Sequence, residues 1–378
     1  MTNPQFHPLT IKSIRHPSKG STALLFDVPE DLAERFAFIP GQYLTLRATV
    51  DGEDIRRSYS ICSAATARST TTVASTAMAL ADQLEVGIKQ VPDGRFSNYA
   101  RTLKVGDELQ IMPPMGRFTA SLGGKHDYLL IAAGSGITPC LSIAKSVLKA
   151  EPDSTLTLVY GNQSTKTVMF LDDINALKDR YTQRLQIFHA LSREQSDIDF
   201  LNGRLSAGMI DTLCSKGLIK MADFDAAYIC GPQAMTDELR STLQDLGMAP
   251  EQVKTELFGT QLPPKGAAPA AAKEAASNGA AAVAADIEVE YILDGKRNSL
   301  HMDPEQHTVL AAARGAGLDL PFSCAGGMCC TCRCRIVEGE ASMDVNYSLQ
   351  DWEIEAGFTL ACQSRPTSKH LVLDFDAT

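Results

Sequence analysis

The sequence predicts three unlike domains in one chain: an antiparallel β barrel, a parallel α/β domain and a small α+β domain. Short candidate strands, separated by Pro-Gly, Asp-Gly and Val-Gly-Asp turns, fill residues 1–120. From Tyr128 onward, an apolar run, a glycine turn, a helical pattern and a second apolar run follow one another, which is typical of a βαβ unit. Closely spaced cysteines mark the C-terminal part. A length of 378 residues also indicates more than one domain, because it exceeds the usual size of a domain with a single hydrophobic core.

We place the three domains at residues 1–120, 121–260 and 286–378. Twelve of the 25 residues in 261–285 are alanine and three are proline, which predicts a linker. As a flexible coil this linker would span about 25 to 30 Å. The Thr-, Ala- and Ser-rich segment 64–81 has too weak a periodicity to be assigned.

Hydrophobic periodicity and turn residues give the individual elements. The strands expected in the first domain are Leu9–Ile14, Thr22–Val28, Tyr43–Val50, Tyr59–Cys62, Leu84–Gln90 and Glu108–Met112. In the second domain we expect strands at Tyr128–Ala133, Leu156–Tyr160, Leu185–Leu191 and Ala226–Cys230, and helices at Cys140–Ala150, Leu171–Arg180, Ala207–Lys216 and Gln233–Leu246. The third domain is expected to have strands at Ile287–Leu293 and Asn298–His301 and a helix at Thr308–Ala316.

The strongest chemical signal is the run Cys324, Cys329 and Cys332, followed thirty residues later by Cys362. A C-x4-C-x2-C run with a distant fourth cysteine has the ligand spacing of a plant-type [2Fe-2S] cluster. The competing interpretation is a zinc site. Structural zinc is usually bound by two Cys-x2-4-Cys pairs. Here Cys362 has no paired cysteine nearby in the sequence, so a single pair is available, which favours the iron-sulfur cluster.

Two glycines and two further cysteines belong to the same stretch. We expect Gly326 and Gly327 to adopt backbone angles that let amide groups approach the cluster. Cys330 and Cys334 exceed the count of four ligands, so we expect them to pack as small apolar side chains.

Composition and charge exclude several classes. The net charge is −10, and residues 286–378 carry 15 acidic against 7 basic residues, a net −8. This balance disfavours nucleic-acid binding, and the acidic domain serves either solubility or the docking of a partner. No apolar run is long enough to cross a membrane, and the N-terminus lacks a secretory pattern. The ten cysteines show no disulfide framework, so we expect a cytoplasmic protein.

Two motifs in the first domain point to a flavin. Arg57-Ser-Tyr59-Ser60 resembles the R-x-Y-S flavin-binding motif of the ferredoxin-NADP reductase superfamily, and Gly94-Arg-Phe-Ser97 resembles its pyrophosphate-binding signature. The resemblance implies FAD, with Tyr59 covering the isoalloxazine face, Arg57 binding phosphate and Ser60 reaching the reactive N5 edge. Without a cofactor, the same residues would be a strand tyrosine and an exposed arginine.

The hexapeptide Gly134-Ser-Gly136-Ile-Thr138-Pro139 lies between an apolar strand and a helix. Pro139 replaces the third glycine of the G-x-G-x-x-G fingerprint, but a helix N-terminus still points at a candidate pyrophosphate site. In the superfamily that the chain resembles, this hexapeptide has that role, and a Cys-Gly-Pro triplet, here starting with Cys230 and Gly231, faces the nicotinamide. The alternative for Cys230 is a buried thiol at a strand end.

Ser192 and Arg193 follow the strand expected to end at Leu191. In relatives that prefer NADPH, a Ser-Arg pair at this point binds the 2′-phosphate, so the resemblance implies NADPH over NADH. An exposed arginine that begins a loop is also commonplace. Glu256-Leu-Phe258-Gly resembles the acidic and aromatic end of the superfamily's nucleotide domain, and we expect Phe258 near the flavin.

The third domain resembles a compact β-grasp ferredoxin, and the domain order implies an electron-transfer reductase. Hydride carries two electrons and a [2Fe-2S] cluster takes one, so a flavin must stand between them. The chain is most similar to the reductase subunits of bacterial phenylacetyl-coenzyme A epoxidases, through Leu-Ser-Arg-Glu, Cys-Gly-Pro and the Cys-x-Gly-Gly loop. This resemblance implies catalytic roles for Tyr59, Ser60 and Cys230 and, as electron acceptor, a multisubunit di-iron oxygenase of phenylacetate catabolism.

Other acceptors and one other class of protein stay open. The same architecture serves ring-hydroxylating dioxygenases, desaturases and hybrid-cluster proteins, and no residue identifies the partner directly. A redox-sensing iron-sulfur protein is the alternative outside enzymes, but it would leave the flavin and nicotinamide motifs without a use. The extra Cys330 and Cys334 and the long linker depart from the family pattern.

Overall fold

The computed structural model describes residues 6–65, 84–258, 287–303, 307–349 and 351–377. The expected linker 261–285 and all but the first two residues of segment 64–81 lie outside these ranges. The chain divides into two compact units. One contains the α/β domain and the barrel without Arg56–Ser58, and the other contains the C-terminal domain with Arg56–Ser58.

Six strands form the N-terminal sheet in the order β4-β3-β6-β1-β2-β5. The sheet closes where Ile61 bridges Val86 and the Cys62 amide donates to the Glu85 carbonyl over 2.8 Å. The expected strand at Tyr59–Cys62 has the wrong bounds, because the observed strand runs from Glu53 to Ser60. Its first half is mostly charged and lacks the apolar alternation that predicts a strand. The elements are β1 His7–Arg15, β2 Ser21–Asp27, β3 Tyr43–Val50, β4 Glu53–Ser60, β5 Leu84–Lys89, α1 Arg95–Tyr99 and β6 Glu108–Ile111.

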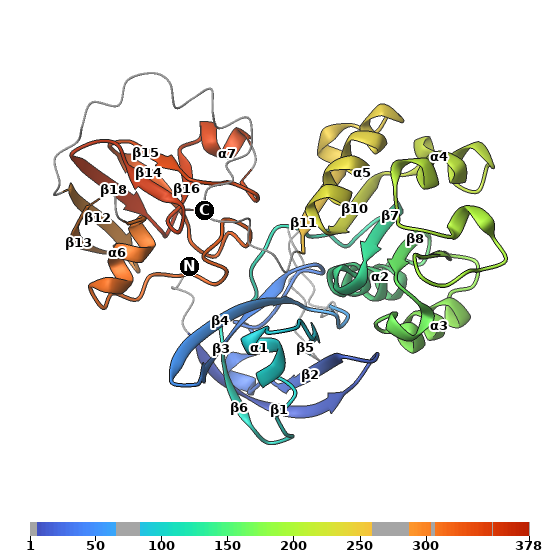
Figure 1. Cartoon of the computed structure of the whole chain (residues 1–378), viewed down its shortest axis with the longest axis horizontal. Coiled ribbons are helices and arrows are strands. Elements are labelled where there is room, and N and C mark those ends of the chain that lie inside the picture. The colour runs from blue at the N-terminus through green and yellow to red at the C-terminus, as the bar shows by residue number, and fades with distance from the viewer. Residues whose placement is uncertain (1–5, 66–83, 259–286, 304–306, 350, 378) are drawn as a thin grey trace. The chain divides into compact units, whose positions relative to one another are not determined.

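The α/β domain has a parallel sheet in the order β11-β10-β7-β8-β9, with α2 and α3 on one face and α4 and α5 on the other (Figure 1). All strand carboxyl ends therefore meet at one edge, where ligands bind in sheets of this kind. The elements are β7 Asp127–Ala133, α2 Ile137–Ala150, β8 Thr155–Asn162, α3 Leu171–Arg180, β9 Leu185–Leu191, α4 Ala207–Ser215, β10 Ala226–Gly231, α5 Gln233–Asp245 and β11 Val253–Leu257.

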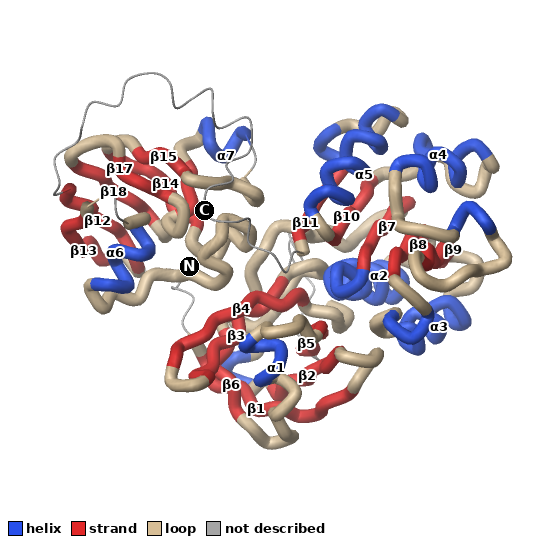
Figure 2. Tube along the Cα trace, in the orientation of Figure 1, coloured by secondary structure: helices blue, strands red, loops and turns tan. Residues whose placement is uncertain are grey.

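The C-terminal unit has a mixed sheet in the order β13-β12-β18-β14-β16 and a small β15-β17 pair. Helix α6 lies beside this sheet (Figure 2) and buries Val309 and Leu310 in a common core with Ile287 and Val289. The elements are β12 Ile287–Leu293, β13 Lys296–Met302, α6 Val309–Gly315, β14 Arg333–Glu338, β15 Ala341–Met343, α7 Asp351–Glu355, β16 Phe358–Leu360, β17 Ser364–Pro366 and β18 His370–Asp374. Of the helices that the structure describes, none has the length and apolar content to cross a membrane.

Candidate functional site

Three side chains from the barrel and the α/β domain meet at the ends of β4, β10 and β11. The Ser60 hydroxyl donates a hydrogen bond to Oε2 of Glu256 over 3.2 Å. The Cys230 sulfur lies 3.9 Å from the same oxygen. Cys230 and Glu256 are also paired across β10 and β11, so their side chains share one face of the sheet. The structure therefore unites two predicted residues with Glu256, which the sequence had placed only in a terminal motif.

Burial keeps this cluster uncharged near neutral pH. It raises the pKa of Glu256 to about 8, although hydrogen bonds from Ser60 and Cys230 act in the opposite direction. Part of the Glu256 residue is exposed, but its carboxyl group is desolvated. Burial and the nearby Glu256 likewise raise the pKa of the Cys230 thiol well above its usual value. The cluster can therefore hold a proton at pH 7.

Tyr59 and Arg57 lie on the same strand as Ser60. Tyr59 is half-buried, and its ring centroid lies 5.6 Å from that of Phe96 with a tilt of 41° between the rings. Arg57 is exposed, and its Nη1 donates to the Arg56 carbonyl over 2.7 Å. A half-buried phenol beside an exposed guanidinium suits a ligand with an aromatic ring and a phosphate.

Gly94 and Ser97 belong to the turn that starts α1. The Ser97 hydroxyl donates to the Gly94 carbonyl over 3.1 Å and accepts from the Val91 amide over 3.2 Å. A Cβ on Gly94 would lie 2.5 Å from the Ser97 Oγ, so glycine is needed for this closure. The Ser97 hydroxyl thus holds the turn together, and phosphate binding by this turn stays a prediction.

The glycine turn after β7 lies against β10. Gly134 has a φ of +55°, which favours glycine, and a Cβ on Gly136 would lie 2.2 Å from the Cys230 carbonyl oxygen. The Thr138 hydroxyl donates to the Ser135 carbonyl over 3.0 Å and is buried. Gly136 therefore permits the close approach of the turn to Cys230, while Thr138 stabilises the first turn of α2.

Sequence reasoning did not single out Lys89, which ends β5. Its Nζ lies 3.0 Å from the position that a Cβ on Gly134 would occupy. Desolvation lowers the pKa of this ammonium group. A cation beside a glycine turn and a helix N-terminus suits a pyrophosphate. The only sequence signal was a lysine at the end of an apolar strand.

The remaining predicted residues lie at the carboxyl edge of the parallel sheet. The Ser192 and Arg193 amides extend the pairing of β9 with the end of β8, at 2.9 and 2.8 Å, and the Arg193 side chain is exposed. The Phe258 amide donates to the Gly231 carbonyl over 2.8 Å, which fixes Phe258 beside the Cys-Gly-Pro turn. The edge therefore carries the cationic Arg193 after β9 and the aromatic Phe258 after β11.

In the C-terminal unit the four predicted ligands form two pairs. Cys324 is hydrogen-bonded to Cys329, and Cys332 to Cys362. The Ala361 amide donates to the Cys332 carbonyl over 3.0 Å, which brings the end of β16 to the loop. A [2Fe-2S] cluster with four cysteine ligands takes two thiolates per iron. Within the described ranges, no three His, Cys, Asp or Glu side chains form a site for a single metal ion.

Backbone amides of the cysteine loop point at sulfur. The Gly326 and Met328 amides donate to the Cys324 sulfur over 3.3 and 3.4 Å. The hydrogen bond with Cys329 and these amides lower the pKa of Cys324 to about 6. Such donors favour the thiolate, which is the form that binds metal. The four thiols and their amide donors therefore fit an iron-sulfur cluster.

The expectation for the loop glycines was wrong for one of them. The left-handed backbone angles belong to Ala325, Gly327 and Cys330, with φ of +51°, +76° and +54°, and not to Gly326. Gly326 contributes its amide instead. Cys334 is completely buried in the core, with its sulfur 3.9 Å from the Thr359 carbonyl oxygen.

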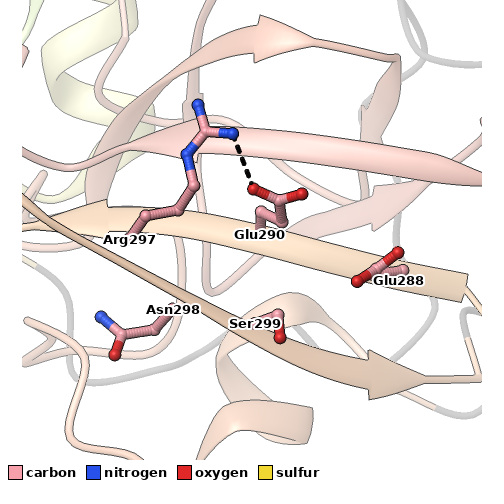
Figure 3. A pocket seen from close by; sticks show the side chains of 5 residues that line it. All are labelled: Glu288, Glu290, Arg297, Asn298 and Ser299. Carbon is pink, nitrogen blue, oxygen red and sulfur yellow. Dashed lines mark hydrogen bonds and ion pairs between the residues drawn. The ribbon is translucent and has the colours of Figure 1, made fainter.

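A hollow of about 280 Å³ on the C-terminal unit lies on β12 and β13 (Figure 3), and no cysteine lines it. Arg297 and Glu290 in its lining form an ion pair at 2.9 Å, and His370 Nε2 lies 3.1 Å from the same carboxylate. These charges satisfy one another, so the hollow offers no evident ligand site. None of the predicted site residues lines it.

Three family models match successive parts of the chain. They are described as an oxidoreductase FAD-binding domain at residues 8–120, an oxidoreductase NAD-binding domain at residues 130–241 and a 2Fe-2S iron-sulfur cluster binding domain at residues 291–367. The cofactors implied by the motifs, FAD, a nicotinamide nucleotide and a [2Fe-2S] cluster, are thereby confirmed.

Relatives match nearly the whole chain. It is 37% identical over 375 residues to one component of the 1,2-phenylacetyl-CoA epoxidase of Escherichia coli (strain K12), with 98% of each chain covered. It is 32% identical over 371 residues to the ferredoxin reductase component of 3-ketosteroid-9-alpha-monooxygenase of Rhodococcus rhodochrous, with 97% of this chain and 96% of that one covered. The structure of phthalate dioxygenase reductase shares the fold, with a TM-score of 0.55, 24% identity and 98% of each chain covered.

Proposed function

The chain belongs to the family of oxygenase reductases that join FAD-binding, NAD-binding and 2Fe-2S domains, and from this we propose that it supplies electrons from NADPH to a phenylacetyl-coenzyme A epoxidase. It is an NAD(P)H-dependent flavin and iron-sulfur oxidoreductase. The observation that carries the choice of acceptor is the 37% identity, over 98% of the chain, to a component of that epoxidase.

We assign FAD to residues 1–120, the nicotinamide nucleotide to residues 121–260 and the cluster to residues 286–378. When bound, the FAD accepts hydride from the nicotinamide and passes electrons one at a time to the cluster. Tyr59 and Phe258 offer aromatic faces to the flavin, and Arg57 offers a cation to a phosphate. The Gly94–Ser97 turn would hold the FAD pyrophosphate.

We assign Ser60 and Glu256 to proton exchange at the flavin edge. A carboxyl group with a pKa of about 8 exchanges its proton readily near neutral pH. Ser60 Oγ, 3.2 Å from that carboxyl group, would connect Glu256 to a bound FAD for proton exchange. The uncharged Cys230 thiol would contact the nicotinamide without placing a charge beside it.

The nucleotide-binding residues lie along the carboxyl edge of the sheet. The turn with Gly134, Gly136 and Thr138, together with Lys89, accommodates the pyrophosphate of NADPH. We assign Gly231, next to Cys230, to the nicotinamide site. Ser192 and the exposed Arg193 bind the 2′-phosphate, for which a guanidinium fork is well suited.

Cys324, Cys329, Cys332 and Cys362 hold the cluster, and the acidic C-terminal unit docks the oxygenase. In our proposal that oxygenase is a multisubunit di-iron complex. A cytoplasmic location agrees with the cysteines, because none of the ten, all of which lie in the described ranges, forms a disulfide.

Reconstitution tests this function. The purified protein, NADPH and the remaining epoxidase components should convert phenylacetyl-coenzyme A to its epoxide, and leaving out the protein should abolish turnover. The oxygenase of a 3-ketosteroid-9-alpha-monooxygenase is the second candidate acceptor, because the reductase of that system is 32% identical. Product from the steroid and none from phenylacetyl-coenzyme A would reverse the assignment.

A further inference from the structure

Asn162 is the last residue of β8 and lies at the carboxyl edge of the parallel sheet. Its carbonyl accepts the Ser192 amide over 2.9 Å, so it adjoins the residues after β9. Two residues earlier, the Tyr160 hydroxyl donates to the Gly134 carbonyl over 2.8 Å. Residues two apart on a strand point to the same side, so the Asn162 side chain faces the side of the glycine turn.

The intervening glycine supports this orientation. A Cβ on Gly161 would lie 3.2 Å from the Cβ of Leu205, which belongs to the core on the opposite face of the sheet. Asn162 therefore lies between the glycine turn after β7 and the Ser192-Arg193 segment after β9.

The Asn162 amide is buried and unsatisfied. Among the described residues, four buried side-chain nitrogen and oxygen atoms have no hydrogen-bond partner, and three of them are Asn162 Nδ2, Asn162 Oδ1 and His189 Nδ1. The Tyr160 oxygen, whose proton goes to the Gly134 carbonyl, can accept one of the two Nδ2 protons, and a hydrogen bond from Asn162 acts to lower the pKa of Tyr160. The second Nδ2 proton and Oδ1 still need a partner. Buried amides in folded proteins nearly always have hydrogen-bond partners, so we expect a ligand to supply the missing ones.

We propose that the Asn162 amide binds the adenosine ribose of the nicotinamide nucleotide. The inference rests on the nucleotide site proposed above. In NADPH this ribose connects the pyrophosphate, assigned to the glycine turn, with the 2′-phosphate, assigned to Ser192 and Arg193. Asn162 lies between these two places. Oδ1 accepts the ribose 3′-hydroxyl, and Nδ2 donates to the oxygen on the 2′ carbon, which NADH and NADPH both carry.

The ligand chemistry matches the unsatisfied atoms. A ribose hydroxyl both donates and accepts, as does a primary amide, whereas a phosphate would leave Oδ1 facing a negative charge. His189 Nδ1, on the strand beside β8, is a third unsatisfied atom. A sugar with two neighbouring oxygens can satisfy more than one of these groups.

The test uses adenosine 5′-diphosphate and 3′-deoxyadenosine 5′-diphosphate as probes, with calorimetric titration of the FAD-loaded full chain. In the wild type, loss of the 3′-hydroxyl should weaken binding by about tenfold, because one buried hydrogen bond is lost. Asn162→Leu should bind both nucleotides equally weakly. Its melting temperature without nucleotide should equal or exceed that of the wild type, because an unsatisfied amide has been removed.

Gln186→Leu is the matched control, because Gln186 is an exposed amide near the opposite end of β9. It should keep the tenfold preference. If Asn162→Leu does not fold, Asn162→Ser removes the same amide with less apolar bulk and should show the same loss.

The outcomes separate the two proposals. If Asn162→Leu still prefers the 3′-hydroxyl by tenfold, the ribose contact is wrong while the nucleotide site stands. If the wild type binds neither adenosine 5′-diphosphate nor NADPH, the proposed nucleotide site itself is wrong.

Discussion

Ser60 Oγ donates a hydrogen bond to Glu256 Oε2 over 3.2 Å, which joins the end of β4 in the barrel to β11 of the α/β domain. The two residues are 196 positions apart in the sequence. One proton is therefore shared by side chains from two domains that the sequence presents as separate.

Replacing Glu256 with glutamine should change the pH dependence of stability. The pKa of Glu256 is raised by burial from 4.5 to about 8, so the folded protein binds the extra proton between these values. The stabilisation that this provides is complete below pH 4.5 and is lost as the pH rises through 8. Over this window the wild type should lose up to about 1.4 kcal/mol per pH unit relative to Glu256→Gln. Urea denaturation across pH 4.5 to 9 measures the difference.

The exposed Glu251, two residues before β11, provides the control. Glu251→Gln should leave the profile unchanged. Parallel curves for the wild type and Glu256→Gln would show that Glu256 does not titrate in this window.

Serine substitution should separate the cluster ligands from the other cysteines of the loop. Changing Cys324, Cys329, Cys332 or Cys362 should lower bound iron and sulfide sharply, because each position removes one thiolate. Cys330→Ser should keep both. Iron and acid-labile sulfide analysis of the purified proteins measures this.

Cys334 is completely buried, so its serine variant needs a folding check by circular dichroism. A full cluster in Cys362→Ser would contradict the ligand set, as would cluster loss in a folded Cys334→Ser protein.

Arg193→Ala should weaken the use of NADPH and leave NADH almost unaffected. Arg193 is exposed at the carboxyl edge of the sheet, where it can contact a 2′-phosphate. Loss of a charge-assisted contact costs roughly 1.5 to 3 kcal/mol, or about one to two orders of magnitude in kcat/KM. Steady-state reduction of ferricyanide with each nucleotide measures the effect.

Arg240→Ala, an exposed site on α5, is the control and should change neither nucleotide. Equal losses for NADPH and NADH in Arg193→Ala would assign Arg193 a structural role.

Glu353→Ala should destabilise the C-terminal unit. The Glu353 side chain is fully buried and forms an ion pair at 2.8 Å with Arg333, which follows the predicted ligand Cys332. Removing one partner of a buried pair leaves a charge uncompensated and costs about 3 to 5 kcal/mol. Trp352 is the only tryptophan and lies in α7, so its fluorescence reports the unfolding of this unit.

The neighbouring Glu355 is exposed and serves as the control, because Glu355→Ala should cost less than about 1 kcal/mol. Equal stability of the two variants would mean that the buried pair contributes nothing to the fold of this unit.

Electron transfer to the oxygenase should require the acidic C-terminal unit, with its net charge of −8. The Debye length falls from about 10 Å at 0.1 M salt to about 3 Å at 1 M, so transfer to the partner should slow with salt. Flavin reduction by NADPH should respond less. Stopped-flow absorbance follows both steps.

An internal deletion and a C-terminal truncation complete this test. Shortening the linker that the sequence predicts at residues 261–285 should reduce transfer to the partner. A chain ending at Thr260 should reduce ferricyanide and not the oxygenase. Full oxygenase activity of that truncated chain would mean that electrons leave from the flavin.

The sequence by itself determined the features that are local. The spacing of Cys324, Cys329 and Cys332 and the strand-turn-helix pattern around Gly134 each lie within a few residues, so composition and periodicity were sufficient. Four of the five strands of the parallel sheet were predictable from their apolar runs for the same reason, whereas β11 was not expected. Strand β4 was predicted with the wrong start, because its charged residues weaken the alternation on which strand prediction depends.

Only the tertiary structure decided how distant residues combine. Ser60, Cys230 and Glu256 meet because two domains pack together, and Lys89 approaches Gly134 through the same packing. The pKa of Glu256 and the unsatisfied amide of Asn162 depend on which atoms exclude water from them. Desolvation is set by neighbours that are far away in the chain, and a local sequence pattern does not specify them.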